Sequence, residues 1–157
     1  MPQALVDFAI VDVEADLVPI ERIRHHLPQR HEFEMVERVC HLDKEAGIIV
    51  ATRAWNEDDW WAKGHFPDRP LVPGVLMTEA AAQVATVLWK ETAQLEGITI
   101  GFGGLERVRF RAQVTPPARM FFVAKRDKVG SKMASFPTQA FVDGRMVFEA
   151  TILGVSI

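Results

Sequence analysis

A histidine and a glutamate, fourteen positions apart, are the residues of this chain best placed for acid–base chemistry. His65 stands in a segment with Pro67 and Pro70 close behind it, and Glu79 falls in the first turns of a predicted long helix. Prolines restrict the backbone, so such a loop can aim a single side chain. Because histidine is the usual general base near neutral pH and a carboxyl group can supply a proton, the pair predicts a base and an acid acting together.

A third feature suited to catalysis is the start of the predicted helix at Gly74, directly after Pro73. The first amides of a helix have no intrahelical partner and carry the positive end of its dipole. Gly74 has no side chain to block an approaching carbonyl oxygen, so this turn predicts an oxyanion-type site. A base, an acid and a carbonyl polariser suit removal of a proton beside a carbonyl with loss of a β-substituent. They also suit thioester hydrolysis.

The surroundings of Glu79 favour a functional rather than a solvated carboxyl group. Its turn of helix is rich in alanine, and a carboxylate among apolar walls costs free energy unless it is hydrogen-bonded or protonated. Gln83, one turn later, is the natural hydrogen-bond partner. Thr86 and Lys90 continue the same polar stripe, and for these two we favour a solvated face. The four histidines other than His65 are assigned no role.

The hydrophobic pattern predicts one long buried helix at 74–95, which begins after a proline and ends before Gly97. A short amphipathic helix is expected at 20–27, and alternation at 5–13 predicts an edge strand. No helix separates the later strands, which argues against a parallel α/β fold. We therefore expect an α+β fold in which an antiparallel sheet, joined mostly as a meander, wraps a single central helix. The predicted strands are 35–42, 47–55, 98–102 running on into 105–114, 119–128, 132–142 and 145–155.

Length and composition limit the function classes. The 157 residues fit one core, and we expect an N-terminal extension at 1–19 followed by a single domain at 20–157. The net charge of −3 argues against a nucleic-acid binder, and the single cysteine excludes an intramolecular disulfide framework and a cysteine-based zinc cluster. No apolar run reaches the ~18 residues of a membrane span. Residues 1–19 hold no lysine or arginine, unlike a secretory signal, so we expect a soluble cytoplasmic protein.

The segment 64–83 carries a specific resemblance. Its residues fit G-H-F-P-x-x-P-x-x-P-G-V-L-x-x-E-A-x-A-Q at every fixed position and without gaps. This pattern resembles the signature of the β-hydroxyacyl-ACP dehydratases, the FabZ/FabA family, and more closely its FabZ branch. The strand V-R-F-R at 108–111 and the hairpin at 142–147 extend the resemblance over roughly residues 20–155.

The resemblance implies a hot-dog fold and dimers, often assembled as trimers of dimers, with the histidine of one subunit facing the glutamate of the other. It implies that His65 removes the α-proton of a 3-hydroxyacyl thioester and that Glu79 protonates the departing hydroxyl, which yields a trans-2-enoyl thioester. Gly74 would polarise the thioester carbonyl and Gln83 would orient Glu79. No metal or organic cofactor is implied. The residues expected to contact substrate are Gly74, Val75, Phe66 and Gln83.

The partner that the resemblance implies is acyl carrier protein, which is acidic. Arg107, Arg109 and Arg111 alternate along one predicted strand, while Val108 and Phe110 point the other way. A basic patch of this kind would steer an acidic partner despite the negative net charge. An ordinary solvated strand face explains the same pattern equally well.

Some positions depart from the family pattern. Glu32 and Glu34 stand where the family has proline and an apolar residue, the approach to the motif at 56–65 is longer, and Thr78 replaces an apolar residue. The chemistry motif is intact while its rims differ. Two alternatives therefore stay open: a hot-dog acyl thioesterase, and a non-catalytic acyl-thioester-binding paralogue.

Overall fold

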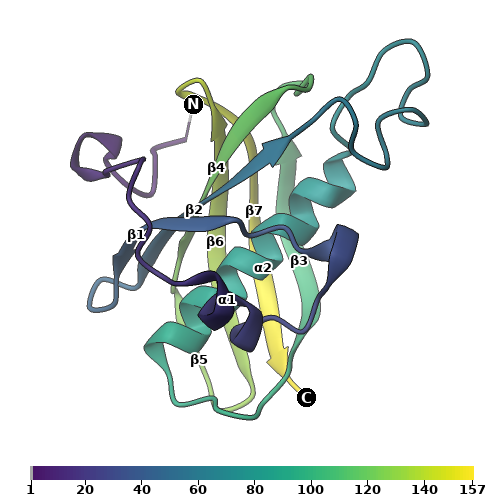
Figure 1. Ribbon diagram of the computed structural model, residues 1–157. Coiled ribbons are helices and arrows are strands. Elements are labelled where there is room, and N and C mark those ends of the chain that lie inside the picture. Colours follow the sequence, from purple (N-terminus) through teal and green to yellow (C-terminus); the bar gives the residue numbers. More distant parts are fainter. Residues whose placement is uncertain (1) are drawn as a thin grey trace.

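The computed structural model describes residues 2–157, and its main element is one seven-stranded antiparallel sheet (Figure 1). The strand order is β1-β2-β4-β6-β7-β3, with the short β5 paired to β6. The edge strands of this path are therefore β1 and β3. The strands are β1 (Arg38–Asp43), β2 (Ile48–Trp55), β3 (Ile100–Phe110), β4 (Ala118–Lys125), β5 (Lys128–Val129), β6 (Met133–Val142) and β7 (Arg145–Ser156).

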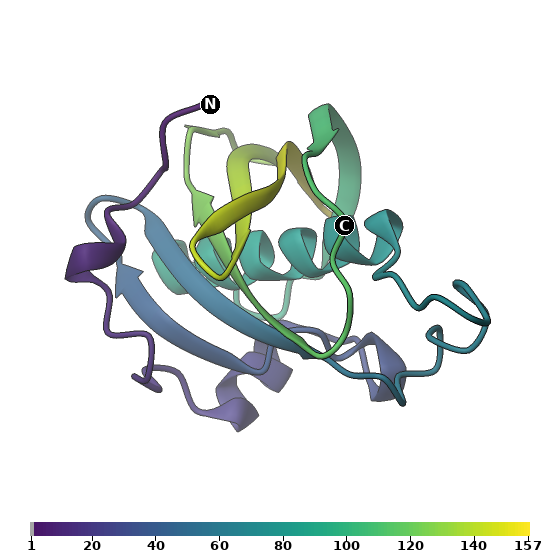
Figure 2. The ribbon, with the colours of Figure 1, turned by 90° about the horizontal axis from the view of Figure 1, so that it is seen from above.

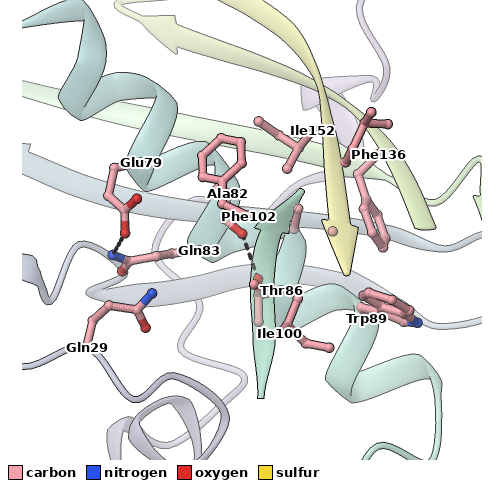
Figure 3. A pocket seen from close by; sticks show the side chains of 14 residues that line it. Gln29, Glu79, Ala82, Gln83, Thr86, Trp89, Ile100, Phe102, Phe136 and Ile152 are labelled. Carbon is pink, nitrogen blue, oxygen red and sulfur yellow. Dashed lines mark hydrogen bonds between the residues drawn. The ribbon is translucent and has the colours of Figure 1, made fainter. Parts of the chain in front are cut away.

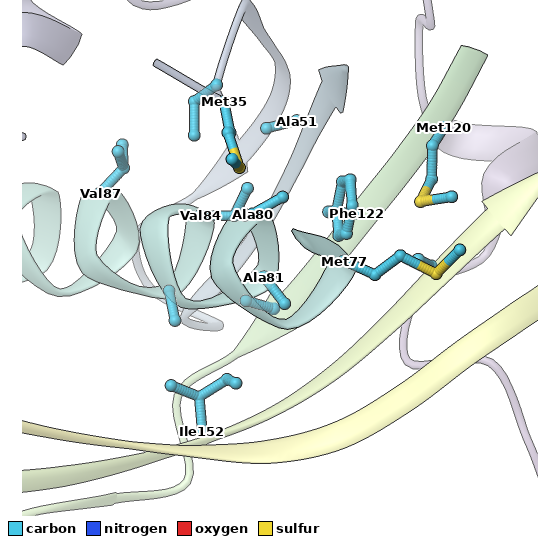
Figure 4. Close-up of a cluster of buried hydrophobic side chains, with 14 of the residues drawn as sticks. Met35, Ala51, Met77, Ala80, Ala81, Val84, Val87, Met120, Phe122 and Ile152 are labelled. Carbon is cyan, nitrogen blue, oxygen red and sulfur yellow. The ribbon is translucent and has the colours of Figure 1, made fainter. Parts of the chain in front are cut away.

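The helix α2 (Gly74–Thr92) lies along the concave face of the sheet (Figure 2). Its alanines let the strands approach closely: Ala80 and Ala81 are fully buried, and Figure 4 shows them beside Phe122 of β4 and Ile152 of β7. A helix apolar around most of its circumference must be covered on most sides. The expected α+β architecture, an antiparallel sheet around one long central helix, is confirmed.

The side of α2 that faces away from the sheet is covered by an N-terminal layer. This layer contains α1 (Ile20–His26) and the 3-10 turn η2 (His31–Phe33). Ile23 and Leu27 of this layer belong to the same buried cluster as α2, and so does Met35. The helix is thus enclosed from both sides, which limits the directions in which its polar side chains can point.

The strand order differs from a simple meander in one respect. The chain leaves β2, passes through the long loop at 56–73 and α2, and then forms β3 at the far edge beside β7. β4 returns to pair with β2 in the middle of the sheet. The helix spans the face of the sheet and so delivers the chain to the opposite edge. The hairpin signals in the sequence do not predict that the chain crosses the sheet in this way.

The predicted edge strand at 5–13 is wrong. The segment forms the 3-10 turn η1 (Phe8–Ile10), with the Asp7 side chain accepting a hydrogen bond from the Ala9 amide. It lies on the outer face of the sheet, where Val6 and Val11 are buried against residues of β1, β2, β4 and β6. Its alternating apolar residues therefore reflect burial on one side of an irregular segment. No helix within residues 2–157 is long and apolar enough to cross a membrane.

Candidate active site

His65 is held at the end of the loop that precedes α2. Its backbone amide donates to the Trp61 carbonyl, and its ring stacks on Phe66 with 4.2 Å between ring centroids. Its Nδ1 lies 2.8 Å from the Leu71 carbonyl oxygen. Because a carbonyl oxygen can only accept, Nδ1 carries the hydrogen in the neutral ring, and the lone pair is on Nε2. The imidazole is thus held in one tautomer, with Nε2 ready to take a proton.

Glu79 is oriented by Gln83, as the spacing predicted. Gln83 is 1% exposed, and its Nε2 donates to Glu79 Oε1 at 2.9 Å. The same amide is held by the backbone: Nε2 also donates to the Phe33 carbonyl oxygen, and Oε1 accepts from the Met35 amide. Every heavy polar atom of the Gln83 side chain therefore has a partner, so the amide can hold the Glu79 carboxyl in one position.

A cavity of about 40 Å³ opens beside Glu79 (Figure 3). Its polar end holds Glu79, Gln83 and Gln29, and the Gln29 Oε1 is buried without a hydrogen-bond partner. Sequence reasoning assigned Gln29 no role. Away from this end the wall is largely apolar. The remaining lining residues are Ala82, Ala85, Thr86, Trp89, Ile100, Gly101, Phe102, Phe136, Ile152, Leu153 and Gly154.

His65 lines a different cavity, at the N-terminal end of α2. Gly74 and Val75 also line it, and their amides are at the start of the helix, where no intrahelical acceptor exists. Phe110 of β3 packs across Gly74 so closely that a Cβ there would lie 2.7 Å from the ring. Only glycine leaves this turn of backbone open. Val75 is 72% exposed and Phe66 50% exposed, which is unusual for apolar residues beside a pocket.

Within one chain the base and the acid are not brought together. The cavity of His65 and the cavity of Glu79 have no lining residue in common. The helix explains why. Gly74 lines the cavity of His65, and Glu79 is five residues further along, which places it ~140° around the helix axis at 3.6 residues per turn. The structure therefore assembles two half-sites, one around His65, Gly74, Val75 and Phe66, and one around Glu79 and Gln83.

The three arginines expected to bind a partner are exposed: Arg107 and Arg109 are on β3, and Arg111 follows its last residue. Arg109 is opposite Glu149 of β7, and Arg111 donates to the same carboxylate at 2.8 Å. Arg107 sits at a bulge, with a positive φ of 52°. Glu149 offsets part of the positive charge, so the patch is less basic than the arginine count alone predicted.

A buried carboxylate that sequence reasoning missed ties α1 to α2. Glu91, near the end of α2, has a side chain only 3% exposed and is bonded by Arg22, His26 and Lys44. Burial alone would raise the pKa of Glu91, but these three hydrogen bonds outweigh it and bring the pKa to about 2. No periodicity marks its partners, which come from α1 and from the turn between β1 and β2.

Comparison with known proteins decides the family. A FabA-like domain matches residues 27–151. The chain belongs to the FabA-like family. It is 37% identical over 140 residues to the 3-hydroxyacyl-[acyl-carrier-protein] dehydratase FabZ of Teredinibacter turnerae, which covers 87% of this chain and 95% of the relative. The FabZ of Streptococcus agalactiae serotype V is 32% identical over 136 residues, with 87% and 96% covered.

Solved structures confirm the hot-dog fold of this FabA-like chain. The dehydratase heterocomplex ApeI:P from Xenorhabdus doucetiae aligns with a TM-score of 0.70 at 15% identity, covering 86% of this chain and 90% of that one. A hypothetical thioesterase with coenzyme A from Streptococcus pneumoniae aligns with a TM-score of 0.63 at 10% identity, covering 88% and 97%. At such identities the likeness concerns the fold alone. Within residues 2–157 no group of three or more His, Cys, Asp and Glu side chains could hold a metal ion.

Proposed function

We propose that this FabA-like chain removes water from (3R)-3-hydroxyacyl thioesters on acyl carrier protein, giving trans-2-enoyl thioesters for fatty-acid or related acyl-chain synthesis. Relatives named FabZ dehydratases match almost their whole length. The observation in the chain itself that carries the proposal is the His65 ring, whose Nδ1 is bound to the Leu71 carbonyl so that Nε2 is free to act as a base.

The chemistry follows from the two half-sites. Nε2 of His65 takes the proton from C2 of the substrate, and the released electron pair forms the C2–C3 double bond. The C3–O bond breaks as the Glu79 carboxyl, entering as the acid, gives its proton to the departing hydroxyl, which leaves as water. The amides of Gly74 and Val75 stabilise the negative charge that develops on the thioester oxygen. Proton return from His65 to Glu79 then restores the starting state.

A dimer would join the half-sites. The long edge strand β3 carries three half-exposed apolar residues, Phe102, Leu105 and Phe110, and Val75 is exposed beside them. An unpaired edge with an apolar row is a template for a second copy, and a two-fold axis would pair β3 with itself. In that arrangement His65 of one subunit meets Glu79 of the other. Trimers of such dimers are part of the same proposal.

Subunit complementation tests this arrangement. His65→Ala and Glu79→Gln should each be inactive alone. In a mixed dimer one site carries both substitutions and the other carries none, so random mixing should restore about a quarter of wild-type activity. Mixing His65→Ala with the double variant restores nothing and is the control. No recovery in confirmed mixed dimers would contradict a shared site.

Carrier-protein binding is proposed for Arg107, Arg109 and Arg111. Replacing Arg107 and Arg109 by Glu should raise KM for the carrier-bound substrate, more strongly at low salt, because surface charges are screened by ions. A substrate on a short pantetheine thiol should keep its KM. An equal change for both substrates would contradict a carrier-protein contact.

A further inference from the structure

The cavity beside Glu79 runs along one face of α2. Glu79, Ala82, Thr86 and Trp89 line it at successive turns, as Figure 3 shows. At 1.5 Å per residue the backbone of Trp89 lies ~15 Å along the helix from that of Glu79. The cavity therefore has a reacting end at the carboxyl group and a far end at the indole.

The walls between these ends suit a hydrocarbon chain. On the helix side they are made by small residues such as Ala82 and Ala85, which leave room beside the backbone. On the sheet side they are made by Phe102, Phe136 and Ile152. A chain that leaves C3 of the substrate at Glu79 would bury its methylenes against these groups and gain from each one.

Trp89 closes the far end, and its ring is held in place. The side chain is 2% exposed and packs against the fully buried Phe136, with 5.8 Å between ring centroids. On its other side the ring lies over Gly154 of β7, where an added Cβ would approach Trp89 Cζ3 to 3.2 Å. With glycine beneath it and phenylalanine beside it, the indole has little freedom to move aside for a longer chain.

We propose that Trp89 is a specificity-determining residue that ends the acyl channel and sets the longest 3-hydroxyacyl chain that this protein accepts. The inference rests on the proposed function, because it uses Glu79 as the reacting end. A chain that reaches the indole gains nothing from further methylenes, whereas in an open channel each buried methylene is worth about a fourfold gain in kcat/KM.

The test is a chain-length profile of kcat/KM with carrier-bound 3-hydroxyacyl substrates of four to sixteen carbons, for wild type and Trp89→Ala. The kcat/KM of wild type should rise with chain length up to the longest chain that fits and fall beyond it. Trp89→Ala should move that fall outward by at least two carbons, with about a tenfold gain on the first disfavoured chain and little change on the four-carbon one.

Gly154→Ala is a second variant that acts in the opposite direction. A methyl group there presses on the indole ring and should move the fall to shorter chains, which keeps the proposal testable where Trp89→Ala folds poorly. Trp55→Phe, in a buried position away from the channel, is the control for general loss of packing.

The outcomes separate the two proposals. An unchanged profile in Trp89→Ala would overturn the role of Trp89 and leave the dehydration standing. A change in KM of equal size at every chain length would place Trp89 beside the carrier arm instead, and would also overturn it. Absence of dehydration by wild type at every length would overturn the proposed function, and this inference with it.

Discussion

Gln83 links the backbone to the Glu79 carboxyl, and replacing it tests that link. Gln83→Met keeps most of the volume but removes the hydrogen bonds to Glu79, Phe33 and Met35. The Met35 amide is buried and would lose its acceptor, at a cost of about 1–3 kcal/mol. The Phe33 carbonyl is nearer the surface and can bind water. We expect a loss of about 2 kcal/mol, or ~4–8 °C in Tm for a chain of this size.

The same substitution should lower activity more than it lowers binding. Without the Gln83 amide the Glu79 carboxyl is free to rotate away from the departing hydroxyl, and a misplacement of this size costs about 10- to 100-fold in kcat. KM should change less than kcat does, because the amides of Gly74 and Val75, which are proposed to bind the thioester oxygen, are unchanged. Steady-state kinetics and thermal unfolding measure the two effects separately.

Gln139→Met is the matched control. Gln139 is a buried amide on β6 that also bonds backbone groups, the Leu5 amide and the Gln3 carbonyl, far from Glu79. It should lose stability and keep kcat. If Gln83→Met lowers Tm but leaves kcat at the wild-type value, or if both variants lose kcat alike, the positioning argument is refuted.

Three further perturbations address other parts of the structure. Glu91→Gln should lower the free energy of unfolding by about 2–3 kcal/mol at neutral pH. In wild type this contribution is present above pH ~4.5 and should be lost as pH falls toward the folded pKa of about 2, which denaturant unfolding of both proteins across this range measures; a stability difference between them that does not change with pH would contradict it. Gly74→Ala should cost about 1–3 kcal/mol and most of the activity through its clash with Phe110, and Phe110→Leu should restore part of the stability in the double variant. Deleting residues 2–16 should lower stability by about 2–4 kcal/mol while kcat/KM stays within about twofold, as expected if 20–157 is the catalytic unit and 1–19 an extension; a large kinetic change would contradict that division.

Local patterns predicted the elements well where burial repeats along the chain. The start of α2 at Gly74 follows from the proline before it, and its near-continuous apolar surface required cover on both sides. The segment at 5–13 failed because its alternating residues are buried by a sheet face that is formed by distant strands. The position of β3 at the far edge likewise depends on how α2 crosses the sheet, which no local pattern encodes.

The site shows the same division between local and distant information. The Glu79–Gln83 bond was predictable because four residues span one helical turn. The other bonds of Gln83 were not, since Phe33 and Met35 are about fifty positions away. The cationic cluster around Glu91 brings together three separate segments and leaves no spacing signal.

The most direct test of the central claim follows a short-chain 3-hydroxyacyl thioester on acyl carrier protein by mass spectrometry, with wild type, His65→Ala and Glu79→Gln side by side. The account predicts a product one water lighter with wild type and none with either variant, all three proteins being folded. Free acid and free carrier thiol would instead identify a thioesterase. An unchanged thioester with folded wild type, at every chain length, would contradict catalysis and leave a binding protein.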